Sequence, residues 1–193
     1  MLAYNLALFV HFVGLISAFG GFVIVQRSGS RLRAARDMDE VRTWLPLLNS
    51  VGPMFGAGYG LLLLSGLYMA FARWRAALPW LVVAIVSLIT LLVVGGIMVG
   101  RSLRVMNAAA ADARGSIPGE LAQRIANPAL WRTISALNGL AMGVVFVMTV
   151  KPGWVGSLAA VLVAATIGGA ISSALARRNS VPTAVDISRT AES

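Results

Sequence analysis

Five long stretches without a charged residue constrain the fold of this chain more than any other feature. An α-helix rises about 1.5 Å per residue and the hydrocarbon core of a bilayer is roughly 30 Å thick, so about 20 apolar residues are needed to cross it. The charge-free stretches cover residues 1–26, 43–72, 76–100, 133–150 and 152–176. The sequence therefore predicts an all-α fold, a polytopic bundle of about five transmembrane helices.

The limits of the bundle follow from the apolar runs and the polar residues beside them. We expect a transmembrane bundle over residues 1–178 and a disordered cytoplasmic tail over residues 179–193, where no apolar period remains. The first apolar run has no basic segment before it and is interpreted as a retained helix, not a signal peptide. The expected spans lie near residues 3–26, 45–71, 78–100, 132–150 and 154–176.

The composition agrees with a membrane protein. Hydrophobic residues make up 58% of the chain and charged residues 12%, which leaves too little polar surface to coat a soluble globule. The net charge of +9 would favour nucleic-acid binding in a soluble protein. Here the basic residues flank apolar spans, where they orient the protein and attract anionic lipid, so we expect no nucleic-acid partner. The absence of cysteine excludes thiol catalysis and cysteine-ligated metal centres.

The basic residues are concentrated in alternate loops. Thirteen fall on one predicted side and three on the other, and short cytoplasmic loops carry the excess. We therefore expect the N-terminus outside and the C-terminus in the cytoplasm, in a multi-pass protein of the cell inner or plasma membrane. The predicted cytoplasmic side carries Arg27, Arg31, Arg33, Arg36, Arg42, Arg101, Arg104, Arg114, Arg124, Arg132, Arg177, Arg178 and Arg189, and the outer side carries Arg73, Arg75 and Lys151.

Local signals predict the connections. Residues 101–114 are strong helix formers that extend the third helix into water, and a short helix follows at 120–126. Asn127 and Pro128 form a cap and first-turn pair for the fourth helix. The turn at 151–153 is short enough to make the fourth and fifth helices antiparallel neighbours.

His11 is the only histidine and the only candidate metal ligand, roughly 12 Å along the first span. It could be a haem or copper ligand or a proton relay, or it could pack by a hydrogen bond worth about 0.6 kcal/mol. A lone histidine cannot complete a bis-histidine haem site, although Met142 or Met148 could supply a second ligand. We favour packing, and no cofactor is favoured.

Asn49 and Asn138 are the other strongly polar side chains of the spans. Because an unpaired amide in hydrocarbon is costly, both are expected to form hydrogen bonds between helices. A ligand pocket built from His11, Asn49 and Asn138 would require the first, second and fourth helices to converge.

Glycines at intervals of four residues indicate close helix packing. They let helix backbones approach, which is compatible with a tight bundle, a homodimer or a larger membrane complex beside the lipid bilayer. On this interpretation Gly56→Leu should damage assembly more than Leu62→Ala. The packing candidates are Gly52, Gly56, Gly60, Gly139 and Gly143.

No span contains an Asp, Glu, Lys or Arg in its interior, and no Walker A, GxSxG or HExxH motif occurs. Proton-coupled carriers usually place an ionisable group within the membrane, and His11 is the sole group of that kind. No catalytic residues are predicted, and an enzyme is disfavoured. The leading interpretation is a transport or accessory subunit without its own catalytic centre, and the alternative is a haem- or copper-binding redox protein that uses His11.

The opening helix carries the run Leu6-Ala7-Leu8-Phe9-Val10-His11-Phe12-Val13-Gly14 followed by Gly20-Gly21. With the basic segment after it and the Lys151-Pro152 turn, this layout resembles small bacterial membrane families related to the copper-resistance D-type domain. The resemblance implies a membrane helix bundle associated with copper or haem, and that association would fall on His11.

Overall fold

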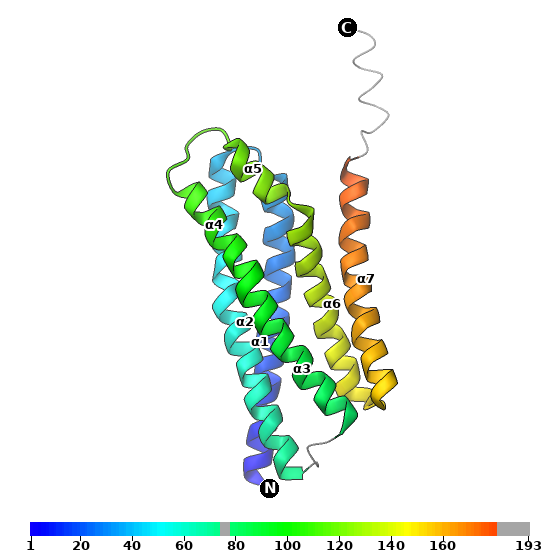
Figure 1. The fold of residues 1–193 in the computed structure, drawn as a ribbon. Coiled ribbons are helices and arrows are strands. Elements are labelled where there is room, and N and C mark those ends of the chain that lie inside the picture. Colours follow the sequence, from blue (N-terminus) through cyan, green and yellow to red (C-terminus); the bar gives the residue numbers. More distant parts are fainter. Residues whose placement is uncertain (74–77, 181–193) are drawn as a thin grey trace.

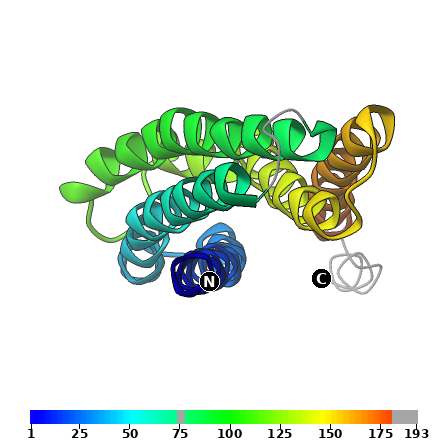
Figure 2. The ribbon, with the colours of Figure 1, turned by 90° about the horizontal axis from the view of Figure 1, so that it is seen from below.

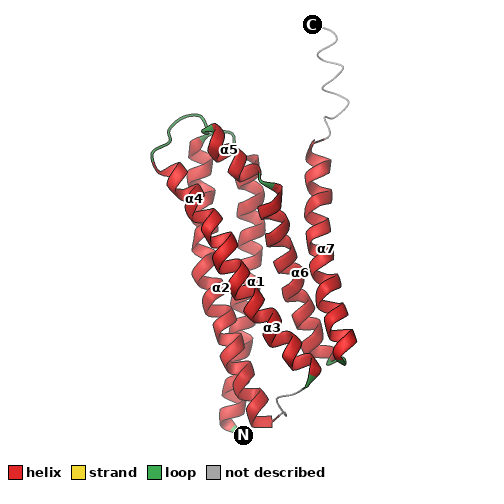
Figure 3. Cartoon of the chain, in the orientation of Figure 1, coloured by secondary structure: helices red, strands yellow, loops and turns green. Residues whose placement is uncertain are grey.

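The computed structural model describes residues 1–73 and 78–180, with the side chains of 174–180 excepted. The described residues are helical apart from short connections, and no strand occurs among them (Figure 3). Five helical stretches are long and apolar enough to cross a membrane, which confirms the predicted fold class. The elements are α1 (Leu2–Ala34), α2 (Met38–Arg73), α3 (Pro79–Val94), η1 (Gly95–Val99), α4 (Gly100–Ala111), α5 (Gly119–Ala126), α6 (Pro128–Val150) and α7 (Trp154–Ser180).

The bundle consists of two helical hairpins and one long tilted rod. α1 packs along α2, and α6 packs along α7. Between them, α3, η1 and α4 follow one another as a continuous rod that crosses the bundle obliquely (Figure 1). The rod contacts α6 along α3 and reaches α2 again at α4. The view along the bundle shows the rod on one side of α2 and α6 (Figure 2).

The predicted cap, tight turn and short helix are present, whereas the helical extension expected over residues 101–114 ends at Ala111. Asn127 Oδ1 accepts a hydrogen bond from the Ala129 backbone N–H at 3.0 Å, as a cap should. Lys151 ends α6 in the left-handed conformation, with a φ of 55°, and α7 turns back along α6. The predicted short helix is α5.

Two boundaries differ from the expectations or fall outside what is described. α7 continues to Ser180, so residues 179 and 180 are helical. The predicted start of the tail at residue 179 is therefore too early. Residues 181–193, the rest of that tail, lie outside the described residues, as does Arg75.

The rod contains a π-helical turn that the sequence did not predict. Over Gly95–Val99 the backbone adopts the π-helical hydrogen-bond pattern. The Gly100 backbone N–H donates to the carbonyl of Gly95, five residues earlier, where an α-helix would use the carbonyl four residues earlier. Such turns interrupt α-helices mostly as single insertions and are frequent at functional sites. Here the turn places two adjacent glycines, Gly95 and Gly96, beside a cavity between α2 and the rod.

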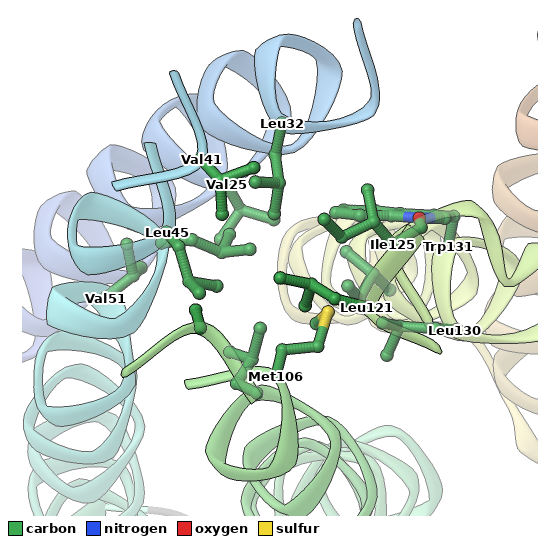
Figure 4. Close-up of a cluster of buried hydrophobic side chains, with 14 of the residues drawn as sticks. Val25, Leu32, Val41, Leu45, Val51, Met106, Leu121, Ile125, Leu130 and Trp131 are labelled. Atoms are coloured by element: carbon green, nitrogen blue, oxygen red, sulfur yellow. The ribbon is translucent and has the colours of Figure 1, made fainter. Parts of the chain in front are cut away.

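At the end of the bundle where α5 lies, the α5 end, the helices extend beyond the expected spans and pack around their own core. α1 has 33 residues and is about 50 Å long at 1.5 Å per residue, well beyond the roughly 30 Å of hydrocarbon. Side chains from α1, α2, α4, α5 and α6 meet there in a cluster that we call the cap core (Figure 4). Its most deeply buried members are Leu32, Met38, Val41, Leu45, Leu48, Val51, Met106 and Leu121.

Trp131 joins three elements of this end. Its indole N–H donates to the Ile125 carbonyl at 2.7 Å, and the guanidinium of Arg33 lies 4.6 Å from its ring centroid. Gly29 makes room for the ring, because a Cβ at that position would collide with it. Trp131 is therefore a buried part of the cap core.

The glycines separate into two groups. Gly139 and Gly143 contact α7 so closely that a Cβ on either would press into the α7 backbone. A Cβ on Gly52, Gly56 or Gly60 would meet no atom of the described residues within 4 Å. The close contact expected along the α2 glycines is therefore not present among the described residues. Leu62, which is buried, contributes more to packing than Gly56 does.

Adding one methyl group to each kind of glycine tests this difference. Gly139→Ala should lower the melting temperature in detergent, because overpacking of a rigid contact costs about 1–3 kcal/mol. Gly56→Ala should leave it equal or higher, since alanine is the better helix former and the new methyl group has space. Equal destabilisation by both substitutions would contradict the placement of the α2 glycines.

Candidate functional site

Two cavities lie one after the other along the bundle. The smaller cavity has a volume of about 190 Å³ and lies among α1, α2, α3 and α6. The larger cavity has a volume of about 320 Å³, at the lower end of the range for small-molecule sites, and lies toward the α5 end. Three side chains line both: Phe22, Tyr59 and Leu91, which we call the shared layer.

His11 lines the smaller cavity and is held by α2. Its Nδ1 lies 3.0 Å from the Ser65 hydroxyl oxygen, and that hydroxyl donates to the Leu61 carbonyl one turn earlier. The Ser65 hydroxyl thus joins His11 of α1 to the backbone of α2. Gly66 leaves room for the ring, since a Cβ there would lie 3.4 Å from Cε1.

Metal ligation by this site would depend on His11 and a sulfur ligand. Among the described residues, no group of three His, Cys, Asp or Glu side chains could hold a metal ion. Met148 lines the smaller cavity with His11, whereas Met142 lines neither cavity and is 54% exposed. Met148 is therefore the one of the two proposed sulfur donors that shares a cavity with His11.

Glycine backbone forms part of the lining of the larger cavity. Gly52 and Gly56 of α2 face it from one side, and Gly95, Gly96 and Gly100 of the rod line it from the other. Gly52, Gly56 and Gly96 are exposed, so the cavity opens on the flank of the bundle between α2 and the rod. Most other lining side chains are aliphatic or aromatic.

Three polar side chains line the larger cavity without a hydrogen-bond partner in the described part of the chain. They are Tyr59, which is only 5% exposed, Asn138 from α6 and Arg104 from α4. Arg104 also makes no ion pair with any described residue. Of the three, Tyr59 is buried, Asn138 is half-buried and Arg104 is exposed, so their hydrogen-bonding groups are available to a ligand or to water in this cavity.

The shared layer is stiffened by aromatic contacts. Phe55 stacks on Tyr59 with ring centroids 5.6 Å apart and an angle of 10° between the rings, and it also contacts Phe22 at 5.1 Å. Phe19 meets Phe22 edge to face at 5.5 Å. Aromatic pairs in these geometries add about 0.5–1.5 kcal/mol beyond their buried area. The layer therefore separates the two cavities with bulky, mutually supported side chains.

The three polar residues predicted from the sequence do not form one pocket. His11 lines the smaller cavity and Asn138 lines the larger one. Asn49 lines neither, because its amide donates to Asn107 Oδ1 at 2.7 Å and to the Leu45 carbonyl at 2.9 Å. The Asn49 to Asn107 bond joins α2 to α4 beside the larger cavity. Sequence reasoning missed Asn107, which was counted only as part of a helical extension.

Sequence reasoning also missed Ser65, Tyr59 and Arg104. Ser65 is 54 residues from His11, and no local pattern connects the two. Tyr59 lies within an apolar run, and Arg104 was counted only toward membrane orientation. A polar residue on the same helical face as the glycines was the available signal for Tyr59, since it follows Gly52 and Gly56 at helical spacing.

Comparisons of the chain with protein-family models, with curated proteins and with solved structures find no match.

The pairing of His11 with Ser65 can be measured with a double-mutant cycle in a reversible detergent-unfolding assay. His11→Ala and Ser65→Ala should each destabilise the protein, and the double variant should lose less than their sum by about 0.6 kcal/mol. Thr90 provides the control, since its hydroxyl donates only to the Val86 carbonyl of its own helix. Additive effects for His11 and Ser65, as expected for His11 and Thr90, would show that the two side chains do not interact.

Proposed function

We propose that this protein is a transport or accessory subunit of the cell inner or plasma membrane, without a catalytic centre of its own. The observation that carries the proposal is the pair of cavities in line along the bundle, separated by the shared layer of Phe22, Tyr59 and Leu91. Two cavities in line, with one layer of side chains between them, suit a molecule that enters one cavity and is either held there or passed to the other.

The opening of the larger cavity favours a molecule that arrives from the bilayer. Gly52 and Gly56 on one flank and Gly96 on the other leave the space open between α2 and the rod, at the level of the predicted spans. No carboxylate or lysine lines either cavity in the described chain. Coupling to protons through carboxylates therefore has no support in these walls, and an apolar or amphiphilic molecule fits them better.

The charge pattern supports placing the α5 end in the cytoplasm. The basic residues of the two loops at this end, such as Arg42 and Arg114, outnumber those at the opposite end. Arg42 donates to the Ala113 carbonyl at 2.6 Å, and the Met38 backbone N–H donates to the Gly115 carbonyl at 3.1 Å. These bonds hold the second of those loops against the start of α2.

A redox protein that binds haem or copper is the second candidate. It is favoured by one specific observation, namely that His11 and Met148 line the same cavity. Soft thioether and imidazole ligands suit copper(I), and a His–Met pair can also hold haem iron. The resemblance to copper-resistance D-type families agrees with this alternative. An absorption spectrum and a metal analysis of the purified protein distinguish the two functions, because a ligated haem absorbs strongly in the Soret region and bound copper is found by metal analysis.

The barrier role of the shared layer is testable without knowing the cargo. In proteoliposomes followed by stopped-flow light scattering, Leu91→Ala should raise glycerol permeability above that of wild type, because it removes part of the wall between the cavities. Leu88→Ala is the matched control, since Leu88 is similarly buried but lines only the smaller cavity.

Thermal melting and size-exclusion chromatography should first show that both variants are folded. A Leu91→Ala permeability equal to that of Leu88→Ala and wild type would contradict transport through the two cavities.

A further inference from the structure

The larger cavity combines an apolar interior with a cation at one end. Its walls are glycine backbone, aliphatic side chains and the rings of Phe22 and Phe55. Arg104 lies on α4, beyond the end of the predicted third span, and its guanidinium has no partner among the described residues. Such a space fits a molecule with an apolar body and an anionic end.

The shape of the space favours a single chain. The larger cavity is about 320 Å³, and beyond the shared layer the smaller cavity continues along the same bundle axis with mostly apolar walls. A two-chain lipid would have to leave one chain outside, whereas a single alkyl chain lies along the glycine faces of α2 and η1. Without side chains, those faces let a chain approach the helix backbones closely.

We propose that the larger cavity binds a long-chain fatty acid. The carboxylate pairs with the Arg104 guanidinium and accepts a hydrogen bond from the Asn138 amide, and the alkyl chain extends along Gly56 and Gly96 toward the shared layer. Charge-assisted hydrogen bonds of this kind are among the strongest that a binding site can provide. This inference rests on the proposed function, because it names the class of molecule that the larger cavity takes up.

The neighbouring polar groups are consistent with this arrangement. The Asn49 to Asn107 hydrogen bond lies one helical turn from Arg104 and ties α4 to α2 on the headgroup side of the cavity. Neither Asn49 nor Asn107 lines the cavity, so Arg104, Asn138 and the Tyr59 hydroxyl are the polar groups left to meet a carboxylate. No carboxylate side chain of the described residues lines the cavity to compete for them.

The test is photolabelling of the whole protein in lipid nanodiscs with a diazirine analogue of palmitate, read by peptide mass spectrometry. Label should appear in the cavity-lining segments of α2 and η1. Palmitate should compete at least roughly ten-fold better than methyl palmitate, which lacks the charge. Arg104→Gln should remove that preference, while Arg101→Gln, on the same helix but outside the cavity lining, should keep it.

A second pair of variants tests the position of the chain. Gly56→Leu should block labelling by filling the groove, whereas Gly60→Leu should not, because Gly60 lies on the same glycine face but does not line the cavity. Melting temperatures like that of wild type would show that both variants are folded.

Some results would overturn the fatty-acid site. They are competition by phosphatidylglycerol equal to that by palmitate, or equal labelling of Arg104→Gln and Arg101→Gln. If Leu91→Ala still raised glycerol permeability, only the fatty acid would be rejected and the path through the two cavities would stand.

Discussion

The burial of the cap core is the interaction on which the rest of the structure depends. Apolar side chains are driven together most strongly where water is the alternative, and between helices in lipid that driving force is absent. Leu32, Met106 and Leu121 meet at the α5 end, beyond the length that hydrocarbon requires. Five helices are joined there, so the cap core fixes their relative positions before packing within the membrane adds to it.

The larger cavity exists because the cap core fixes the helices at one end and the rod is tilted away from α2. α4 is held against α2 at the cap core and by the Asn49 to Asn107 bond, while α3 diverges toward α6. The space left between α2 and the rod has glycines on both sides and is therefore not filled. The unpaired Tyr59, Asn138 and Arg104 side chains give that space its chemical character, which is why we interpret it as a binding site and not as a packing defect.

Features set by local chemistry could be predicted from the sequence, and features set by helix rotation could not. The Asn127 cap, the Lys151 turn and the five apolar spans depend on residues close in the chain. Glycines at intervals of four residues have the same pattern at Gly139 and at Gly56, yet one helix face meets α7 and the other faces a cavity. The partner of His11 and the role of Arg104 likewise depend on which way each helix is turned, which no local pattern records.

Hydrogen–deuterium exchange of the protein in nanodiscs tests the cap core most directly. Residues 103–110 and 119–126 lie outside the predicted spans, in helices that would fray in water if they were not packed. The amides of α4 and α5 around Met106 and Leu121 should exchange slowly, at rates comparable with those of the spans. Exchange of these segments at the rate of an unstructured peptide would contradict a cap core that holds the helices in place.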